Sequence, residues 1–423
     1  MYESLFSPKV KYWIGQLSRF ISVQIFVQAM GFACGILLVR VLPKEEYAYF
    51  TLANSMQGAM NVLADSGVSS ALSAIGGKVW QDPYRFGQLI NTALKCRRYL
   101  AIVSVVVVTP ILLWMLIRNG APLRYAVVLI AGILLELNFY LTTGVRIVVL
   151  RLHSRIQHIQ HLDLLFSGTR AVLLLGASFT YFNAAIGIFI STLASGLKNQ
   201  VLKHWVDNTI DMSAPSNAED QYEVLKLVRT QAPNTIFYCI QGQLTIWLIS
   251  IFGNTQNIAE IGALSRLGVI FSIASSVLLN IVLPSFARCQ NRNLLIRRYW
   301  EILSGYLLFS LCLILCAVFF PSQLLWILGE QYNHLQDEVF LIIVNSITHA
   351  IAAMLWTINS SRGWIELSWL FVPTLITTEV LLLLVLDIST VKGVILLSTL
   401  SIIPAACINF YMTYKGISKI QSH

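Results

Sequence analysis

Arginine side chains stand inside predicted helices of this sequence, where a charged group requires a partner or a function. Arg170, Arg229 and Arg266 fall within such helices. A charge in hydrocarbon costs at least ~2.5–3.5 kcal/mol unless it is paired or hydrated. The planar guanidinium can donate two parallel hydrogen bonds to a phosphate. The three residues are therefore candidates for an anion-binding site, with Arg266 ranked first, Arg229 second and Arg170 third.

Other charges inside the predicted helices lie at matched depths in antiparallel hairpins, which favours ion pairs. The predicted pairs are Glu136 with Arg170, Arg146 with Asp163, and Arg19 with Asp65. Arg170 thus has two interpretations, a structural pair or part of an anion site. Glu379 has no mate in this scheme and is a candidate for coupling transport to H⁺ or Na⁺.

Motifs for enzymatic chemistry are absent from the sequence. It contains no phosphate-binding G-x-x-x-x-G-K-[ST], no G-x-S-x-G and no H-E-x-x-H. His153, His158 and His161 precede a predicted helix, and solvation in a basic loop is favoured over metal binding. The seven cysteines include no C-x-x-C pair and are interpreted as reduced and structural. We expect neither an enzyme nor a bound metal or cofactor.

The composition explains how these charges are positioned. Of the 423 residues, 56% are hydrophobic and 12% are charged, whereas soluble domains carry about 25% charged residues. Crossing ~30 Å of hydrocarbon takes ~20 helical residues. An all-α integral membrane protein with about twelve transmembrane helices is predicted. Their ranges are 18–39, 46–72, 99–117, 124–150, 162–181, 184–203, 228–252, 258–284, 301–320, 338–360, 364–386 and 392–413.

A polar stretch divides the predicted helices into two groups of six. The expected parts are an amphipathic segment 1–17, a bundle 18–203, a cytoplasmic linker 204–227, a second bundle 228–413 and a cytoplasmic tail 414–423. The halves resemble each other weakly: Tyr47–Ala53 and Ile261–Leu267 both open the second helix of a half. Parallel repeats of this kind are common in transporters.

The distribution of Lys and Arg predicts the orientation. Of 29 such residues, 20 fall on one side of the predicted helices and 5 on the other. Cytoplasmic loops carry the excess of basic residues, so both termini are predicted to be cytoplasmic. The net charge of +9 is explained in the same way and does not indicate nucleic acid.

Two sequence motifs carry a resemblance to a known family. They are the stretch from Leu37 to Phe50, which reads LLVRVLPKEEYAYF, and Asp65-Ser66-Gly67-Val68. The sequence resembles the polysaccharide-transport (O-antigen flippase-like) branch of the multidrug/oligosaccharidyl-lipid/polysaccharide exporter superfamily along almost its whole length. Ala48 stands where the family usually has glycine. The resemblance implies two six-helix bundles and a multi-pass protein of the bacterial inner membrane.

The resemblance also implies a function. It is the export of an undecaprenyl-pyrophosphate-linked oligosaccharide, such as an O-antigen, capsule or exopolysaccharide repeat unit, by alternating access. Membrane lipid, a polysaccharide polymerase and chain-length proteins are then candidate partners. Two alternatives stay open: a cation or drug antiporter of the same superfamily, and an intramembrane polysaccharide polymerase or ligase.

Overall fold

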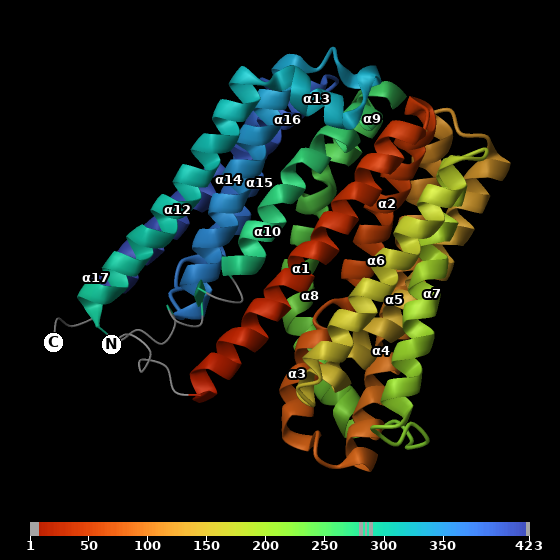
Figure 1. The fold of residues 1–423 in the computed structure, drawn as a ribbon, viewed down its shortest axis with the longest axis vertical. Coiled ribbons are helices and arrows are strands. Elements are labelled where there is room, and N and C mark those ends of the chain that lie inside the picture. The colour runs from red at the N-terminus through yellow and green to blue at the C-terminus, as the bar shows by residue number, and fades with distance from the viewer. Residues whose placement is uncertain (1–7, 279–281, 284–285, 287–290, 420–423) are drawn as a thin grey trace. The chain divides into compact units, whose positions relative to one another are not determined.

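The computed structural model describes residues 8–278, 282–283, 286 and 291–419, and its regular structure there is helical (Figure 1). The chain forms two compact units, Met1–Trp247 and Leu248–His423. Each of the twelve predicted segments overlaps a helix or a pair of helices, and positions 279–281 and 284 of the eighth lie outside the described residues. Within the described residues, seven helical spans are long and apolar enough to cross a membrane, and one of them, Val391–Ser418, combines α16 and α17. The structure therefore confirms the predicted all-helical membrane fold.

Helices of the N-terminal unit pack along one another, with α5 and α6 against α7, α2 against α4, and α1 against α6. The unit contains α1 (Pro8–Val41), α2 (Lys44–Asp65), α3 (Val68–Val79), α4 (Pro83–Arg118), α5 (Leu123–Leu152), α6 (Ile156–Ser178), α7 (Ala184–Asp207) and most of α8 (Ala218–Phe252).

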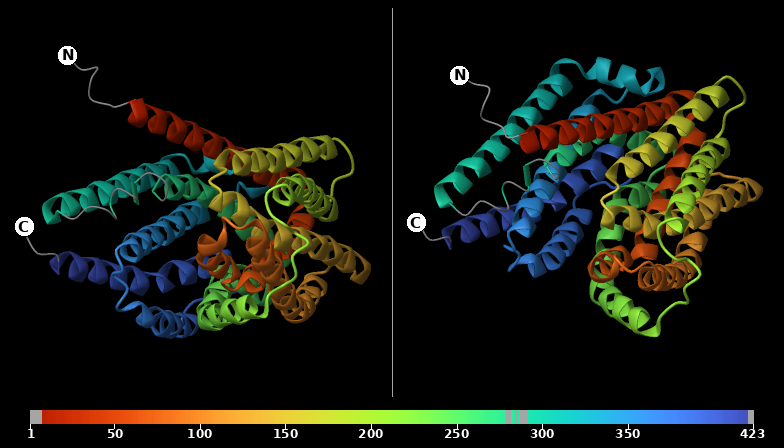
Figure 2. Two further views of the ribbon diagram at one scale, coloured as in Figure 1. Left: turned by 90° about the horizontal axis from the view of Figure 1, so that it is seen from below. Right: turned by 60° about the horizontal axis from the view of Figure 1, so that its bottom comes forward.

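The C-terminal unit pairs its helices in a related way. In the second predicted group of six helices, the fourth helix corresponds to α14 and the sixth to α16 and α17, and these pack against each other. The fourth and sixth helices of the first group, α5 and α7, pack in the same way. Figure 2 shows the unit from two further directions. The helices are α9 (Thr255–Ser265), α10 (Ile270–Val277), α12 (Arg292–Phe319), α13 (Pro321–Leu328), α14 (Gln336–Ser361), α15 (Phe371–Leu383), α16 (Val391–Ser401) and α17 (Ile403–Ser418).

Several predicted helices are interrupted in the structure. The helix predicted over 46–72 breaks after Asp65, where Ser66 and Gly67 have φ values of 34° and 95°. The eighth predicted helix tightens into a 3₁₀ turn, Arg266–Val269, between α9 and α10. The twelfth is divided between α16 and α17 just before Pro404, because proline supplies no backbone N–H for the helical ladder.

Helix α4 begins sixteen residues before the predicted start at position 99. Asp82 caps it by accepting hydrogen bonds from the backbone N–H groups of Tyr84 and Arg85, at 3.0 and 3.1 Å. At 1.5 Å per residue, its 36 residues extend about 54 Å. It is therefore longer than the ~30 Å hydrocarbon layer requires. Its N-terminal part packs in an apolar core with α3 and the adjoining ends of α5, α6, α7 and α8.

The polar linker predicted over 204–227 is largely helical. Helix α7 continues to Asp207 and α8 begins at Ala218, so only 208–217 separates them. This connection is bound to the start of α4: Asp211 N donates to Pro83 O at 3.1 Å, and Asn91 donates to Met212 O and Ala214 O at 3.0 and 2.8 Å. The boundary between the compact units lies within α8 instead. The functional division of the chain stays a prediction.

The last helix is held at its C-terminal end by an exposed carboxylate. Glu366 accepts hydrogen bonds from Lys419 and Lys415, the latter at 2.9 Å. These two ammonium groups lower the pKa of Glu366 to about 2 from its ordinary 4.5. The ion pairs therefore stabilise the end of α17 fully above pH 4.5, and this contribution is lost as the pH falls toward 2.

We expect Glu366→Gln to remove this part of the acid sensitivity. At pH 4.5 the backbone of residues 403–418 should exchange hydrogen more slowly in the wild type than in the variant. As the pH falls toward 2, the wild-type rate should approach the rate of the variant measured at the same pH. Glu330, an exposed acid in the same unit, supplies the matched control Glu330→Gln. Identical pH profiles for the wild type and Glu366→Gln would contradict the prediction.

Candidate functional site

The N-terminal unit contains polar and charged side chains among its apolar helices, which we name the interior polar network. Because hydrocarbon offers no hydrogen-bond partners, such groups must satisfy one another or a ligand. The network comprises Gln57 of α2, Glu136, Thr142 and Arg146 of α5, Asp163 and Arg170 of α6, and Ser195, Lys198 and Asn199 of α7.

One part of the network surrounds Glu136. Its carboxylate accepts a hydrogen bond from Ser195 Oγ at 3.4 Å, is hydrogen-bonded to Gln57, and is attracted by the Arg170 guanidinium. Arg170 also acts electrostatically on Cys34 of α1. Arg170 therefore lies where α1, α5 and α6 meet. It is near Glu136, the carboxylate predicted to be its partner because the two residues have matched depths.

A second part of the network surrounds Asn199. Its side-chain oxygen accepts a hydrogen bond from Thr142 Oγ1 at 2.9 Å and a longer one from Arg146 Nη1 at 3.4 Å. Within the described part of the chain, the buried Nε atom of Arg146 has no hydrogen-bond partner. Arg146 interacts at longer range with Asp207, which attracts it, and with Arg98, which repels it. The guanidinium thus retains hydrogen-bonding capacity for a further acceptor.

The structure places Asp163 against Lys198 rather than against the predicted Arg146. Lys198 Nζ lies 2.8 Å from Asp163 Oδ1. Matched depth in a hairpin fixes the height of two residues but not the faces that meet. Helix α6 packs mainly on α1 and α7 and only slightly on α5, so the cation that reaches Asp163 comes from α7.

Asp65 also has a partner other than the predicted one. Its Oδ1 lies 2.5 Å from Nη2 of Arg97, because α2 packs along α4. Asp65 also accepts hydrogen bonds from the Ser69 backbone N–H and hydroxyl, at 3.2 and 2.7 Å. It thereby joins the end of α2 to the start of α3. The side chain of Arg19, the predicted partner, lies outside the described residues.

Arg97 precedes the helix predicted over 99–117 but is 1% exposed on α4. Its guanidinium donates to Leu141 O at 3.1 Å and lies 5.5 Å from the ring centre of Tyr140. Gly144 provides the space, since a Cβ there would come within 2.1 Å of Arg97 Nη1. The missed signal was a helical spacing of buried positions on α4. These are Phe86, Ile90, Ala93 and Arg97.

The remaining predicted candidates are distributed between the units. Arg229 is exposed on α8, before the boundary at Trp247. Arg266 belongs to the C-terminal unit, where it opens the 3₁₀ turn and is half-buried. Glu379 is half-buried on α15. Only Arg170 of the three predicted anion ligands belongs to the interior polar network.

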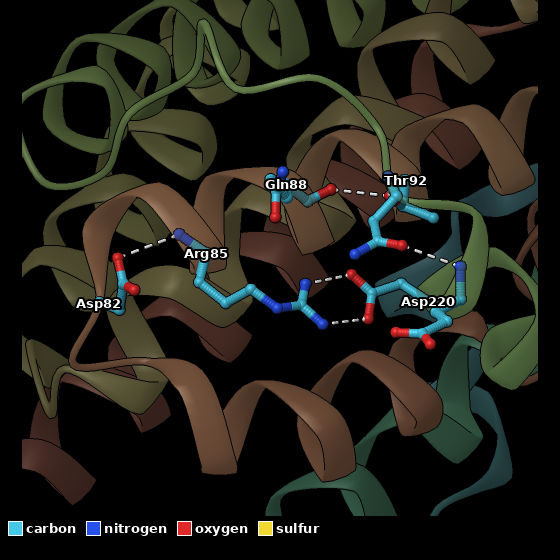
Figure 3. A network of polar contacts seen from close by, with 7 residues as sticks. Asp82, Arg85, Gln88, Thr92 and Asp220 are labelled. Atoms are coloured by element: carbon cyan, nitrogen blue, oxygen red, sulfur yellow. Dashed lines mark hydrogen bonds and ion pairs between the residues drawn. The ribbon is translucent and has the colours of Figure 1, made fainter.

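Figure 3 shows a separate network that fixes the start of α8 to the start of α4. Arg85 forms a two-point ion pair with Asp220, with Nη2 donating to Oδ1 at 2.7 Å. Asp220 is 2% exposed. The backbone N–H of Asn217 donates to Thr92 Oγ1 at 2.9 Å. These contacts give Arg85 and Asp220 a structural role.

Two carboxylates, the half-buried Glu46 and the buried Glu260, occupy equivalent places in the two halves. The repeat that aligns Tyr47 with Ile261 also aligns Glu46 with Glu260. Glu46 accepts hydrogen bonds from the Tyr125 hydroxyl and from Ala184 N, the latter at 2.8 Å. Glu260 lies 2.8 Å from His334 Nε2, just before α14. Each carboxylate therefore ties the second predicted helix of its half to the start of the fourth, which supports the internal repeat.

No protein-family model matches the sequence. No curated protein matches it either. Neither comparison therefore identifies a family for this chain.

Solved structures with a similar fold are transporters. An inward-facing multidrug resistance MATE family transporter of the MOP superfamily superposes with a TM-score of 0.71 at 14% identity, covering 95% of this chain and 98% of that one. An outward-facing conformation of such a transporter gives a TM-score of 0.60 at 15% identity, covering 97% and 96%. The fold is therefore shared with these transporters.

A further structure with this fold is a MOP superfamily transporter from Pyrococcus furiosus. It superposes with a TM-score of 0.63 at 16% identity, with 96% of each chain covered. Reverse polarity of its binding pocket is described as suggesting a different function.

Proposed function

We propose that this protein is an alternating-access transporter of the bacterial inner membrane that exports a polyprenyl-pyrophosphate-linked oligosaccharide. The shared fold supports transport, and the sequence motifs from Leu37 to Phe50 and at Asp65 favour this cargo. The excess of Lys and Arg on one side of the predicted membrane helices favours a cytoplasmic location of both termini. A polysaccharide polymerase and chain-length proteins are the partners that such a cargo would require.

The charge of the interior polar network is the observation that carries the proposal. It contains three cations, Arg146, Arg170 and Lys198, and two carboxylates, Glu136 and Asp163. Lys198 pairs with Asp163, and Arg170 attracts Glu136. Within the network, the charge of Arg146 is therefore not matched by a carboxylate, and Asp207, outside the network, attracts it only at longer range. A site for a dianionic pyrophosphate needs such a donor, because charge-assisted hydrogen bonds best replace the water that the phosphate loses.

A cation antiporter is the second candidate function. The multidrug transporters that share the fold favour it. Such a protein would use carboxylates in the membrane to attract its cargo and to couple H⁺ or Na⁺. Glu379 is the candidate for that role here. The carboxylates of the interior polar network argue against it in the N-terminal unit, since each is close to a cation.

Deleting the gene in its own host tests the proposed function. We expect loss of a surface polysaccharide and accumulation of its polyprenyl-pyrophosphate-linked repeat unit on the inner leaflet. Expression of the intact gene should reverse both effects. Unchanged surface glycan with increased sensitivity to cationic dyes would favour the antiporter. Glycosyl transfer by the purified protein would indicate a polymerase or ligase.

A further inference from the structure

A cavity of about 480 Å³ separates the start of α12 from the end of α17 in the C-terminal unit. Figures 1 and 2 show these two helix ends at the same end of the unit. Its lining combines one cation, several aromatic rings and aliphatic side chains. The lining residues are Arg292, Ile296, Tyr299, Trp300, Phe410, Thr413, Tyr414, Ile417 and Ser418.

Arg292 is the cation available to a ligand in this cavity. Among the described residues, its buried Nε atom has no hydrogen-bond partner. Two acids of the same unit are already engaged. Glu301 accepts from Arg297 at 2.8 Å, and Glu366 accepts from Lys415 at 2.9 Å. Within the described part of the chain no acid forms an ion pair with Arg292, so its charge is available to an anionic ligand.

The aromatic side chains indicate the depth of the cavity in a membrane. Trp300 and Tyr414 are 59% and 73% exposed. In a soluble protein, aromatic rings exposed to this extent would be in contact with water, which is unfavourable. Trp and Tyr concentrate where hydrocarbon meets the headgroups, because they combine an apolar ring with a polar tip. The basic residues around this end of α12 also place it on the side predicted to be cytoplasmic.

We propose that this cavity binds an anionic phospholipid of the cytoplasmic leaflet. The phosphodiester accepts charge-assisted hydrogen bonds from Arg292. Ser418 lines the same cavity, with its hydroxyl donating to Lys415 O at 2.8 Å. An acyl chain lies along Ile296 and Ile417. A lipid satisfies both parts of the lining, whereas a free anion would leave the aliphatic part in contact with water.

Lipid binding to the intact purified protein tests the proposal. Phosphatidylglycerol should raise the midpoint of thermal unfolding and remain bound to the protein during native mass spectrometry. Phosphatidylcholine should raise the midpoint less and be retained less. Arg292→Ala should weaken retention of phosphatidylglycerol about tenfold, as expected for one charge-assisted hydrogen bond. Arg292→Lys should retain part of the binding. Arg297→Ala supplies the matched control, because Arg297 is on the same helix, 77% exposed and does not line the cavity.

A second variant separates binding from folding. Ile417→Phe keeps Arg292 and fills part of the aliphatic lining, so it should also lower lipid retention while the protein stays folded. Equal retention of the two lipids, or wild-type retention in both Arg292→Ala and Ile417→Phe, would overturn the proposal. Inorganic phosphate as effective as phosphatidylglycerol at equal concentration would also overturn it, and would indicate a site for the free anion.

Discussion

Replacing Arg146 by alanine is expected to lower export at least about tenfold while the protein still reaches the membrane. Within the interior polar network the charge of Arg146 is not matched by a carboxylate, and its Nε atom has no hydrogen-bond partner among the described residues. Its contact with Asn199 is long, at 3.4 Å. Hydrogen bonds to a charged group contribute about 1.5–3 kcal/mol, so export per folded molecule should fall at least about tenfold.

Graded substitutions at Arg146 distinguish charge from geometry. Lysine should retain part of the activity, because it keeps the charge but loses the two-point donor geometry. Glutamate should be the most damaging, because it repels the pyrophosphate. Arg124→Ala is the matched control, since Arg124 is exposed near the opposite end of the same helix. Surface glycan should be normalised to the amount of protein in the membrane.

Two results would contradict a role of Arg146 in cargo binding. Normal export by the alanine, lysine and glutamate variants at normal abundance would exclude the residue from the anion site. A loss of export in proportion to abundance would make Arg146 structural. Arg266→Ala is informative in the same assay, because Arg266 was the first candidate from the sequence and lies in the other unit.

Breaking the ion pair between Asp65 and Arg97 is expected to destabilise the N-terminal unit strongly. Removing one partner of a buried pair leaves an uncompensated charge and typically costs about 3–5 kcal/mol. The Arg97 side chain is 2% exposed and that of Asp65 is 26% exposed. Asp65→Asn and Arg97→Ala should therefore both reduce the fraction of protein that elutes as a monodisperse species from a detergent column and lower its thermal midpoint.

Removing both charges tests whether the two residues act as a pair. Asp65→Asn combined with Arg97→Ala should be less destabilising than the sum of the single changes. Arg98→Ala is the control, because Arg98 is adjacent and exposed. Additive effects of the two single changes would mean that the ion pair contributes nothing of its own. Gly144→Ala should resemble Arg97→Ala, because its Cβ would occupy the space of the guanidinium.

Much of the fold was predictable, because the length and apolarity of a membrane helix are visible in the sequence. The ends of the helices were less predictable than the membrane spans themselves. The first part of α4 is amphipathic, and its polar residues suggested a loop although Phe86 and Ile90 are buried. The start of α8 was missed for the same reason. Amphipathic extensions outside the hydrocarbon lack the continuous apolar pattern that reveals a membrane span.

The partners of the charged residues were less predictable than their depth. Matched depth in antiparallel hairpins correctly predicted that Glu136 lies near Arg170. The same criterion predicted the wrong partners for Asp163 and Asp65. The sequence carries the height of a residue in a helix, whereas the facing helix depends on how the whole bundle packs. Asp65 and Asp163 each pair with a cation on the following membrane segment, α4 and α7, rather than on the preceding one, and depth alone does not choose between these two neighbours.

The docking of α8 on the N-terminal unit bears on how the protein is made. Side chains of α8, including Val224 and Val228, belong to the same apolar core as those of α3 to α7. A ribosome that has completed α7 must still synthesise roughly 40 residues before the unit ends at Trp247. At about 5–20 residues per second this takes roughly 2–8 s. During that interval the first six membrane segments lack the complete α8 that packs on their core.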